Sequence, residues 1–404
     1  MEICVKPRKL SGKIKAPDSK SDMHRKLICA ALCNRGLVLH MDTTCICDDV
    51  EATIQCLRAL GTTITVLSDT AVEIIPGAIH AAVPQLDCHE SGTTLRFLLP
   101  VAAALYGQAS FSGDPSLVKR PIVPVLRALE SHGVYSNSSH LPLKLSGFLN
   151  AGKYTIPGNI SSQFISGLLL ALPLLDEESR IILTSPLESA SYVDMTIQVM
   201  AQFGVKVKKL KDGFVIPKNQ QYRSPDDMSV EGDWSSSAFF IPFGAECDGL
   251  DPDSLQPDRK IAEFASLLSP GAAVEDLFID VSPHPDLVPV LAVLACRVKG
   301  HVVLGNARRL RLKESDRLAS VAAMIHNLGG LVEEHEESLV ITGTGSLTGG
   351  RISSYNDHRI VMAASVASVL CKNDVIITDA QVYKKSYPGF LWDFNALGGE
   401  YHVF

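Results

Sequence analysis

The stretch CLRALGTTITV, residues 56–66, joins a helical pattern to a β-rich run through a single glycine, Gly61. Glycine is favoured directly after a helix because it adopts a positive φ without steric cost, so this order predicts a helix, a left-handed residue and then a strand. The same order recurs four more times: LRALESHGVYS (126–136), VMAQFGVKVKKL (199–210), MIHNLGGLVEEH (324–335) and FNALGGEYHVF (394–404). One structural unit is therefore repeated along the chain.

The spacing of the glycines indicates the size of this unit. It is 72, 71 and 69 residues for the pairs Gly61–Gly133, Gly133–Gly204 and Gly329–Gly398. Helix–glycine–strand order is common in any α/β protein, but near-constant spacing in both halves of the chain favours true repetition. Six such units would fill 404 residues, so we expect a degraded sixth copy near 260–275 and two domains of three repeats, separated near 217–229. Alternating helices and strands predict a mixed α/β fold.

Composition excludes several classes of protein. Hydrophobic residues make up 46% of the chain, charged residues 20%, and the net charge is −7, which argues against disorder and against nucleic-acid binding through bulk charge. The N-terminus lacks the apolar core of a signal peptide, and the most apolar stretches, 164–175 and 287–296, are shorter than the ~18 residues of a spanning helix. The ten cysteines show no paired metal-binding spacing, so reduced thiols in a soluble cytoplasmic protein are expected.

Positive side chains are concentrated in short polar motifs despite the acidic net charge. In four of these motifs a polar loop runs straight into an apolar helical stretch, with the cation in or next to the first turn. A helix N-terminus offers unpaired N–H groups and partial positive charge, and arginine adds bidentate pairing to phosphate or carboxylate. Each cation could instead be a solvated surface residue or pair with Glu314 or Asp316, but four such helix starts together predict a substrate with several anionic groups. The candidate cations are Lys20, Arg25, Arg96, Arg120, Lys313, Arg317, Arg359 and Lys385.

Hydroxyl, amide and carboxylate groups mark further helix starts. They suit the binding of phosphate and hydroxyl groups, although the same residue types also serve as plain N-caps. No P-loop, G-x-G-x-x-G, H-E-x-x-H or paired C-x-x-C motif is present and His358 is isolated, so neither a metal nor a cofactor is expected. The hydroxyl and amide groups at these helix starts belong to Ser161, Ser162 and Gln163, and the carboxylates are those of Asp233, Asp286 and Glu314.

Together these motifs resemble those of the EPSP synthase family, the 3-phosphoshikimate 1-carboxyvinyltransferases. They occur in family order from residue 12 to residue 390, and KESDR combined with NDHR is highly specific. The matching motifs are Lys20-Ser21 with Arg25, Ser91-Gly92-Thr93 with Arg96, Lys119-Arg120-Pro121, Ser161-Ser162-Gln163, Glu231-Gly232-Asp233, Pro285-Asp286, Lys313-Glu314-Ser315-Asp316-Arg317, Asn356-Asp357-His358-Arg359 and Lys385-Ser386-Tyr387-Pro388.

The resemblance implies a fold and a reaction. The fold is an inside-out α/β barrel with two similar domains, each of three βαβαββ repeats. It implies a discontinuous first domain of residues 1–17 plus 232–404, a second domain of residues 18–231 and a substrate cleft between them. The reaction moves the enolpyruvyl group of phosphoenolpyruvate to the 5-hydroxyl of shikimate 3-phosphate and releases phosphate, in the shikimate pathway that leads to chorismate and the aromatic amino acids. We expect a monomer that acts on these small molecules, with no nucleic-acid or membrane partner.

The resemblance also implies roles for individual residues. The catalytic set is Lys20, Asp286 as the base toward the hydroxyl, and Glu314 as the proton donor to carbon. Shikimate 3-phosphate would be held by Lys20, Ser21, Arg25, Ser161, Ser162, Gln163, Ser189, Asp286 and Lys313, with Tyr192 beneath the ring. Phosphoenolpyruvate would be held by Lys20, Gly92, Arg120, Gln163, Arg317, Arg359 and Lys385. The herbicide glyphosate occupies the phosphoenolpyruvate site in this family.

Three positions depart from the family pattern. Glu90 stands where many members have Asn, Arg309 aligns with an Asn that commonly contacts the shikimate phosphate, and Ser189-Ala190-Ser191-Tyr192 replaces the usual Ser-Lys-Pro-Tyr. Two rival readings remain open at this point. The first is the sister enolpyruvyl transferase acting on UDP-N-acetylglucosamine, which carries a reactive cysteine that is absent from residues 107–121; the second is a non-catalytic binding module, in which Asp286, Glu314 or Lys20 would be expected to decay first.

Overall fold

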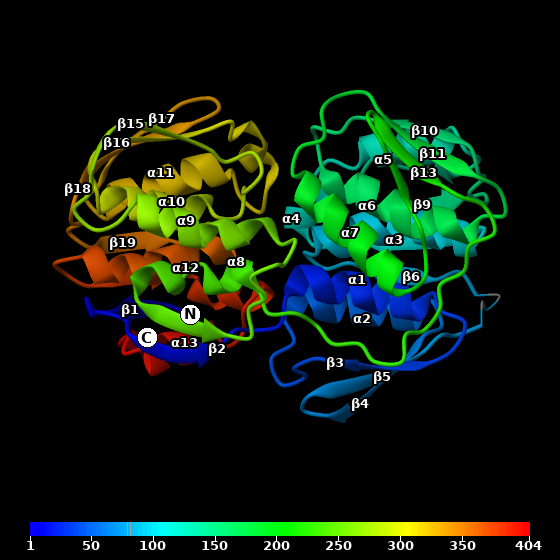
Figure 1. Cartoon of the computed structure of the whole chain (residues 1–404), viewed down its shortest axis with the longest axis horizontal. Helices are drawn as coiled ribbons and strands as arrows, with labels where there is room; N and C mark the ends of the chain where they lie inside the picture. Colours follow the sequence, from blue (N-terminus) through cyan, green and yellow to red (C-terminus); the bar gives the residue numbers. More distant parts are fainter. Residues whose placement is uncertain (79, 81) are drawn as a thin grey trace. The chain divides into compact units, whose positions relative to one another are not determined.

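The repeats expected from the glycine spacing are present as six α/β units (Figure 1). The computed structural model describes residues 1–78, 80 and 82–404. The chain divides into two compact parts: Met1–Ser19 with Glu231–Phe404, here called unit 1, and Lys20–Val230, here called unit 2. Each part contains three of the six sheets, so the predicted mixed α/β fold with repeated units is confirmed.

Unit 2 holds three consecutive repeats. The first contains α1 (Lys20–Ala31), β3 (Leu37–His40), α2 (Asp48–Ala59), β4 (Thr63–Ser68) and β5 (Ala71–Ile75). The second contains β6 (Gln85–Asp87), α3 (Gly92–Leu105), β7 (Gln108–Ser112), α4 (Pro115–Val118), α5 (Val123–Glu130), β8 (Tyr135–Ser136) and β9 (Leu143–Ser146). The third contains β10 (Lys153–Ile156), α6 (Ser162–Ala171), η1 (Leu172–Leu174), β11 (Ser179–Leu183), α7 (Ala190–Gln202), β12 (Lys208–Leu210) and β13 (Gly213–Ile216).

Unit 1 holds the other three repeats. The shortest contains β2 (Gly12–Lys15), α8 (Trp234–Ser237), η2 (Ile241–Phe243), β14 (Ala245–Asp248), η3 (Pro257–Lys260) and α9 (Ile261–Leu267). The next contains β15 (Ala273–Asp280), α10 (Val288–Cys296), β16 (Lys299–Gly305), η4 (Arg308–Leu312), α11 (Arg317–Asn327), β17 (Leu331–Glu334) and β18 (Leu339–Thr344). The last contains β19 (Gly350–Ser353), α12 (His358–Ala367), η5 (Ser368–Leu370), β20 (Val375–Thr378), η6 (Ala380–Lys385), α13 (Phe390–Ala396), β21 (Tyr401–Val403) and the N-terminal strand β1 (Ile3–Val5).

Four of the six sheets share one strand order. In each, the first two strands are parallel and joined by a buried helix, and an antiparallel pair follows, as in β15-β16-β18-β17. In the first repeat of unit 2 the sheet is β3-β5-β4, and the segment around Ser229 forms a parallel bridge to His40 where a first strand would lie. The order βαβαββ places the N-termini of the first helices of the repeats at the ends of parallel strands, where ligands bind in α/β folds.

The five glycines that identified the repeats all have the conformation expected from the sequence. Each follows the last helix of its repeat and precedes an edge strand. Their φ angles are +95° at Gly61, +92° at Gly133, +80° at Gly204, +80° at Gly329 and +92° at Gly398. Any residue with a side chain would have a strained backbone at these positions. This explains why glycine is present in every copy of a motif whose other residues vary.

The sixth repeat is degraded, as the sequence predicts. The segment 260–275 does contain a helix, α9, and a glycine of positive φ, Gly271 at +75°. The strand that follows, β15, pairs with β16 and so begins the next repeat instead of completing the sixth copy. The short repeat keeps only the parallel pair of β2 and β14 among the described residues. No antiparallel pair is assigned to this repeat in the described part of the chain, and periodicity alone could not show this.

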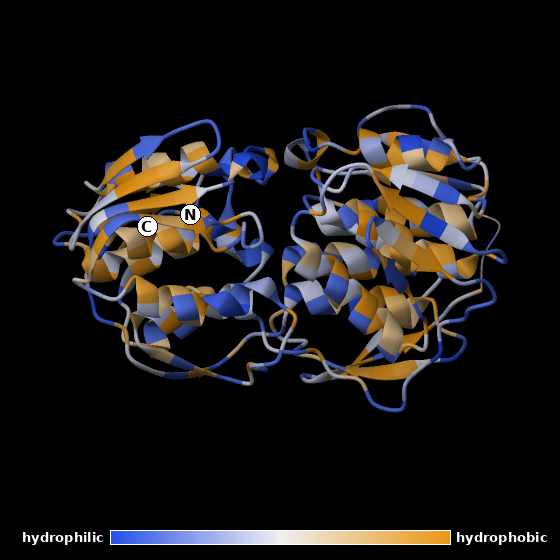
Figure 2. Cartoon of the chain, turned by 45° about the horizontal axis from the view of Figure 1, so that its top comes forward, coloured by the Kyte–Doolittle hydropathy of each residue, from blue (hydrophilic) through white to orange (hydrophobic). Residues whose placement is uncertain are grey.

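Each unit has a hydrophobic core of its own. All nine residues of α10 and all ten of α12 are buried. Figure 2 shows that strands and helices carry most of the hydrophobic residues and that the connecting loops are largely hydrophilic. In the part of the chain that the structure describes, no helix combines the length and the hydropathy needed to cross a bilayer.

Candidate active site

The polar motifs of the sequence lie at the N-terminal ends of buried helices. In unit 2, Ser91 Oγ accepts a hydrogen bond from the Thr94 amide of α3 at 3.2 Å, and Ser161 Oγ accepts from the Gln163 amide of α6 at 3.3 Å. Each of these caps accepts a hydrogen bond from one amide, and other N–H groups of the first turn can donate to a bound anion. The N-cap interpretation is therefore correct for Ser161, and it leaves the anion-binding role of this helix start open.

The carboxylates of unit 1 fall into two kinds. Asp233 caps α8 through the Ser236 amide at 2.9 Å, so its N-cap interpretation is correct. In contrast, α10 begins at Val288 without a side-chain cap, and α11 is capped by Asp316. Asp286 and Glu314 precede these two helices and cap neither. Their oxygens face cationic side chains instead, which distinguishes them from ordinary helix caps.

Lys20 and Arg25 lie on the first two turns of α1. Lys20 Nζ is 2.7 Å from Asp49 Oδ2. Arg25 is 2% exposed, its Nε donates to Thr196 Oγ1 at 2.8 Å, and its Nη2 donates to the Tyr192 carbonyl at 2.9 Å. The contacts with α7 hold the Arg25 guanidinium in one orientation, and the Asp49 carboxylate pairs with the Lys20 ammonium.

A second group of unit 2 connects α3 with α6. Arg96 Nη1 donates to Gln163 Oε1 at 2.6 Å, and Gln163 Nε2 donates to Thr93 Oγ1 at 2.8 Å. The amide orientation of Gln163 is therefore defined by one donor and one acceptor, and the residue joins the Ser91-Gly92-Thr93 loop to the Ser161-Ser162-Gln163 loop. The structure thus brings together two motifs that are about 70 residues apart in the sequence.

Gly92 lies against Arg120. A Cβ atom placed on Gly92 would be 2.7 Å from Arg120 Nη1 and 3.5 Å from Arg96 Nη1. Glycine allows this close approach of the two side chains, and its backbone freedom is not used, since φ of Gly92 is not in the left-handed region. Two guanidinium groups therefore converge on the first residue of α3, which is the arrangement expected of an anion site.

The centre of the unit 1 cluster is Arg317, which is fully buried. Its Nη1 donates to Asp286 Oδ1 at 2.8 Å, its Nη2 to Glu314 Oε2 at 2.5 Å and its Nε to Asp357 Oδ2 at 2.9 Å. Burial alone would lower the pKa of Arg317, but the charges of Asp357, Glu314 and Asp286 outweigh burial and raise it above its usual value. One guanidinium therefore holds the two proposed proton-transfer carboxylates in fixed positions.

Asp286 also faces two further cations. Its Oδ1 is 3.4 Å from Lys313 Nζ, and its Oδ2 is 3.3 Å from Arg359 Nη2. Burial raises the pKa of Asp286, but the positive charges of Arg359, Lys313 and Arg317 hold it well below its usual range. Burial lowers the pKa of Lys313, and Arg317 adds to this effect while Asp286 opposes it. Without substrate, Asp286 is an ionised carboxylate of low basicity.

Positive φ angles occur in two loops that carry or contact residues of the predicted site. Lys385 is 8% exposed, and its Nζ donates to the Asn356 carbonyl at 3.0 Å. Tyr355 and Asn356 have φ of +52° and +56°, and Ser189, at the start of α7, has φ of +52°. Such conformations cost about 1–3 kcal/mol and are concentrated at functional sites. The strain at these positions supports a binding role for the loops before α7 and α12.

The departures from the family pattern have definite positions. Glu90 Oε1 accepts a hydrogen bond from Ser116 Oγ of α4 at 2.6 Å, which ties the glycine loop to the segment that leads to Arg120. Arg309 donates to the Ser282 carbonyl at 3.1 Å, and its charge contributes to lowering the pKa of Lys313. Arg309 therefore adds positive charge near Lys313 rather than pointing into solvent.

Sequence reasoning missed several supporting residues. Asp49 and Asp357 hold Lys20 and Arg317. Asp357 was recognised only as part of the Asn356-Asp357-His358-Arg359 motif, without a role of its own, and Asp49, in the first turn of α2, carried no signal that distinguishes it from other acidic residues at helix starts. A buried chain of hydrogen bonds runs from His24 Nδ1 to Thr53 Oγ1 at 2.7 Å and from there to Thr94 Oγ1 at 2.6 Å. Burial, helped by the charges of Lys20 and Arg25, lowers the pKa of His24 well below its usual value, so this histidine is neutral and structural.

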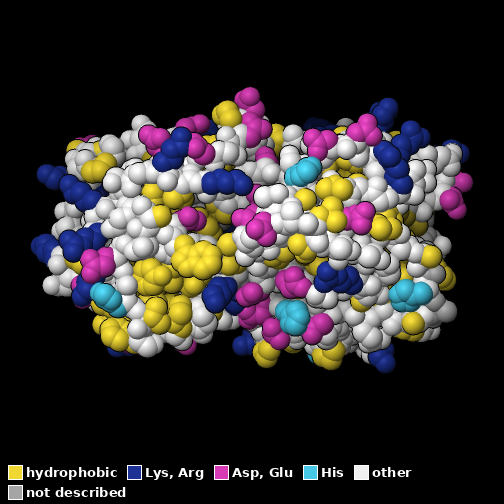
Figure 3. Space-filling view, turned by 90° about the horizontal axis from the view of Figure 1, so that it is seen from below, with side chains coloured by type: hydrophobic (Ala, Val, Ile, Leu, Met, Phe, Trp, Pro, Cys, Tyr) yellow, Lys and Arg dark blue, Asp and Glu magenta, His cyan; other side chains and the backbone are white. Residues whose placement is uncertain are grey.

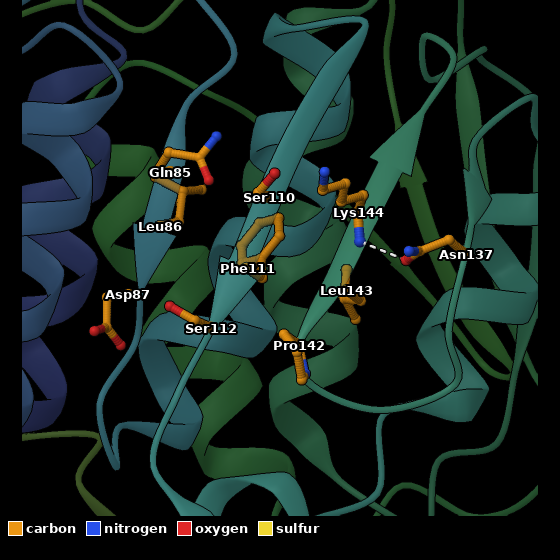
Figure 4. Close-up of a pocket in the computed structure, with 10 residues that line it drawn as sticks. All are labelled: Gln85, Leu86, Asp87, Ser110, Phe111, Ser112, Asn137, Pro142, Leu143 and Lys144. Atoms are coloured by element: carbon orange, nitrogen blue, oxygen red, sulfur yellow. Dashed lines mark hydrogen bonds between the residues drawn. The ribbon is translucent and has the colours of Figure 1, made fainter.

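The described surface offers a separate pocket away from these clusters. It has a volume of about 290 Å³ and lies on the sheet β6-β7-β9-β8, where Figure 4 shows Phe111 and Lys144 among its lining residues. None of the predicted site residues lines it.

Among the described residues, no group of three or more His, Cys, Asp or Glu side chains is arranged to hold a metal ion. On the face seen in Figure 3, acidic and basic side chains are interspersed.

Comparison with known proteins identifies the family. The family described as EPSP synthase (3-phosphoshikimate 1-carboxyvinyltransferase) matches residues 5–394. The chain belongs to the EPSP synthase family. It is 41% identical to the 3-phosphoshikimate 1-carboxyvinyltransferase of Clostridium kluyveri, with 98% of this chain and 97% of the relative covered, and 38% identical to that of Clostridium perfringens strain ATCC 13124, with 98% of each covered.

The structural comparison supports the fold. EPSP synthase from Acinetobacter baumannii, solved at 2.37 Å, has a TM-score of 0.80 to this chain over 100% of both chains, at 23% sequence identity. The family expected from the motifs is thus confirmed, and the chain is an EPSP synthase of the shikimate pathway, which serves aromatic amino acid biosynthesis. Its reaction converts shikimate 3-phosphate and phosphoenolpyruvate to 5-enolpyruvylshikimate 3-phosphate, so the rival readings as a UDP-N-acetylglucosamine transferase or a non-catalytic module are set aside.

Proposed function

We propose that two clusters of side chains carry out this transfer, one in each unit. The unit 2 cluster contains the starts of α1, α3 and α6, and the unit 1 cluster contains the starts of α11 and α12 with the loop before α10. The two substrates carry two phosphates and two carboxylates, and the clusters supply cations and helix N-termini for them. The single observation that carries the proposal is the guanidinium of Arg317, which holds Asp286 at 2.8 Å and Glu314 at 2.5 Å.

The reaction needs two proton transfers, and two carboxylates are available for them. One proton must leave the 5-hydroxyl of shikimate 3-phosphate, and one must reach the methylene carbon of phosphoenolpyruvate. We assign the first to Asp286 and the second to Glu314, with Lys20 as the third catalytic group. One buried guanidinium brings the two carboxylates close to each other, which suits two transfers on one reacting pair of substrates.

The basicity of Asp286 would depend on the substrates. In the substrate-free protein, Arg359, Lys313 and Arg317 hold the pKa of Asp286 well below its usual range. A phosphate or carboxylate bound by Arg359 and Lys313 would draw positive charge away from Asp286, so the pKa of Asp286 rises as the site fills. The enzyme would therefore gain its general base only when the substrate anions are bound.

The assigned binding residues divide between the two substrates. Arg317 is assigned to phosphoenolpyruvate. Because its guanidinium is already bound by carboxylates such as that of Glu314, the substrate anion must replace one of them. For shikimate 3-phosphate the assigned residues are Lys20, Ser21, Arg25, Ser161, Ser162, Gln163, Ser189, Asp286 and Lys313. For phosphoenolpyruvate they are Lys20, Gly92, Arg120, Gln163, Arg317, Arg359 and Lys385.

The test is phosphate release measured with both substrates together and with each alone. Wild type should release phosphate only with both. Asp286→Asn and Glu314→Gln should each lower kcat by ~10²-fold or more, which is the size expected for loss of a general acid or base. Affinity for shikimate 3-phosphate should fall more in Asp286→Asn than in Glu314→Gln. Turnover close to wild type in Glu314→Gln would remove that residue from the donor role.

The exposed Asp253 offers a matched control for these variants. Asp253→Asn changes the charge of unit 1 by the same amount without touching the cluster, so its kcat should equal that of wild type.

We further infer that the enzyme needs no metal or cofactor, because lysine and arginine supply the positive charge at the phosphates. Activity should survive EDTA. A monomeric state and a cytoplasmic location remain predictions, and size-exclusion chromatography with light scattering tests the first.

A further inference from the structure

Two loops in the second repeat of unit 2 carry residues that we assign to phosphoenolpyruvate. The first loop follows β6 and leads through Glu90 to Gly92 at the start of α3, and the second follows β7 and leads through α4 to Arg120. The last residues of the two strands, Asp87 and Ser112, are paired in the parallel sheet, and Figure 4 shows them side by side. Both loops therefore begin at the same edge of one sheet.

Three contacts hold the second loop against the first. The Asp114 amide donates to the His89 carbonyl at 2.8 Å. The backbone of Gly113 packs so closely that a Cβ atom there would be 2.9 Å from the His89 carbonyl oxygen. Ser116 Oγ, on α4, donates to Glu90 Oε1 at 2.6 Å. Such a short bond is typical of a hydroxyl that donates to a carboxylate, and these bonds are stronger than neutral ones.

An unbroken stretch of α4 joins Ser116 to Arg120. Leu117, next to Ser116, is 1% exposed and belongs to the hydrophobic core of unit 2. The Arg120 amide donates to the Leu117 carbonyl at 3.0 Å, so Arg120 continues directly from the last turn of α4. Leu117 anchors α4 on the core, and the Ser116 hydroxyl attaches the adjacent residue to the first loop. Without that hydroxyl, α4 could shift relative to the first loop, and Arg120 would move with it.

The spacing of the two loops decides how close Arg120 comes to Gly92. Arg120 Nη1 is 2.7 Å from the place where a Cβ atom of Gly92 would lie, and Arg96 Nη1 is 3.5 Å from it. Arg96 also contacts the second loop, because its Nη2 donates to the Pro121 carbonyl at 3.3 Å. A small anion bound beside Gly92 needs these donors at a constant distance, so its affinity depends on how firmly the loops are joined.

We propose that Ser116 is a positioning residue for phosphoenolpyruvate: its hydrogen bond to Glu90 fixes α4 on the loop before α3 and so places Arg120 beside Gly92. The inference rests on the proposed assignment of Arg120 and Gly92 to that substrate. It also gives Glu90, which departs from the family pattern, a role as the acceptor of this bond. The residues assigned to shikimate 3-phosphate lie outside the two loops, so the effect is specific for phosphoenolpyruvate.

The test measures kcat and KM for each substrate by steady-state phosphate release. Ser116→Ala removes the hydroxyl, and we expect KM for phosphoenolpyruvate to rise about tenfold while KM for shikimate 3-phosphate changes less than about twofold. Ser116→Thr keeps a hydroxyl and should restore the wild-type KM. Ser112→Ala, at the exposed end of β7, is the matched control and should follow wild type. An unchanged KM for phosphoenolpyruvate in Ser116→Ala, or an equal rise for both substrates, overturns the proposal.

A double-mutant cycle with Glu90→Ala shows whether the hydrogen bond carries the effect. Removing the Glu90 carboxylate also changes the charge near the substrate, so the readout is the factor by which Ser116→Ala raises KM in each background. We expect about tenfold in the Glu90 background and about onefold in the Glu90→Ala background, where the acceptor is gone. An equal factor in both backgrounds overturns the proposal, because the Ser116 hydroxyl would then act without Glu90.

The assignment on which the inference rests is tested separately with Arg120→Ala. If this variant has the wild-type KM for phosphoenolpyruvate, the proposed function fails at Arg120. If KM rises in Arg120→Ala but not in Ser116→Ala, only the role of Ser116 is overturned. If KM rises in both, Ser116→Ala should add little in the Arg120→Ala background. A full further rise there would show that Ser116 does not act through Arg120 and would overturn the proposal.

Discussion

Gly92→Ala should weaken phosphoenolpyruvate binding through Arg120 while leaving the fold intact. The added methyl would be 2.7 Å from Arg120 Nη1, and ordinary contact begins at 3.4 Å, so the guanidinium must move by 3.4 − 2.7 = 0.7 Å. The end of an arginine side chain can shift at a cost of about 0.5–1.5 kcal/mol, and alanine is well tolerated in a helix. The displaced guanidinium, however, loses an aligned, charge-assisted hydrogen bond worth about 1.5–3 kcal/mol.

At about 1.4 kcal/mol per factor of ten, this loss raises KM for phosphoenolpyruvate by about 10- to 100-fold. The assay is steady-state phosphate release at saturating shikimate 3-phosphate, with thermal unfolding measured in parallel. Inhibition by glyphosate should weaken more than substrate binding, because glyphosate is the longer molecule and meets the methyl group first. Inhibition constants for wild type and Glu90→Asn test whether the carboxylate at position 90 also lowers sensitivity to glyphosate.

A double-mutant cycle decides whether Arg120 carries the effect. In an Arg120→Ala background the methyl group has no guanidinium to displace, so Gly92→Ala should change KM little further. An unchanged KM in the single variant would refute the reasoning. An equal loss in both backgrounds would show that the methyl group acts on the ligand directly rather than through Arg120.

Three further predictions follow from the charged clusters and from the reaction. Arg317→Leu leaves Asp286, Glu314 and Asp357 without their shared cation and should cost about 3–5 kcal/mol of folding stability, measured by urea unfolding; a loss below ~1 kcal/mol would contradict the buried network. The pKa of Asp258 is raised in the folded state from 3.8 to about 7, so the folded protein retains a proton that the unfolded chain releases, and stability is lost as pH rises through this window. The Tm of Asp258→Asn relative to wild type should therefore increase from pH 5 to pH 8, and a difference independent of pH would refute the shift. Because residues of both units are assigned to one pair of substrates, we predict that substrates lower the radius of gyration, with motion near residues 15–18 and 229–233; an unchanged value in small-angle scattering would count against it.

Local patterns were sufficient to predict the repeated architecture and most of the candidate residues. The five glycines were found because positive φ after a helix is a property of a single residue, and the structure shows it at every one of them. The cation motifs were found because a helix N-terminus is also local, defined by a polar loop followed by an apolar run. The strand pairing in the short repeat of unit 1 could not be predicted because pairing joins distant segments: β15 follows α9 in sequence yet pairs with β16.

The sequence by itself determined the fold class, the number of repeats and the kinds of charged group that the substrates require. It could not show which carboxylates cap a helix and which face a cation, since Asp233 and Asp286 occur in similar polar loops. Only the tertiary structure places Asp286, Glu314 and Asp357 on Arg317, with Asp258 buried close by. These residues come from four separate segments, and their charges interact because folding removes them from water, where the same interactions would be screened.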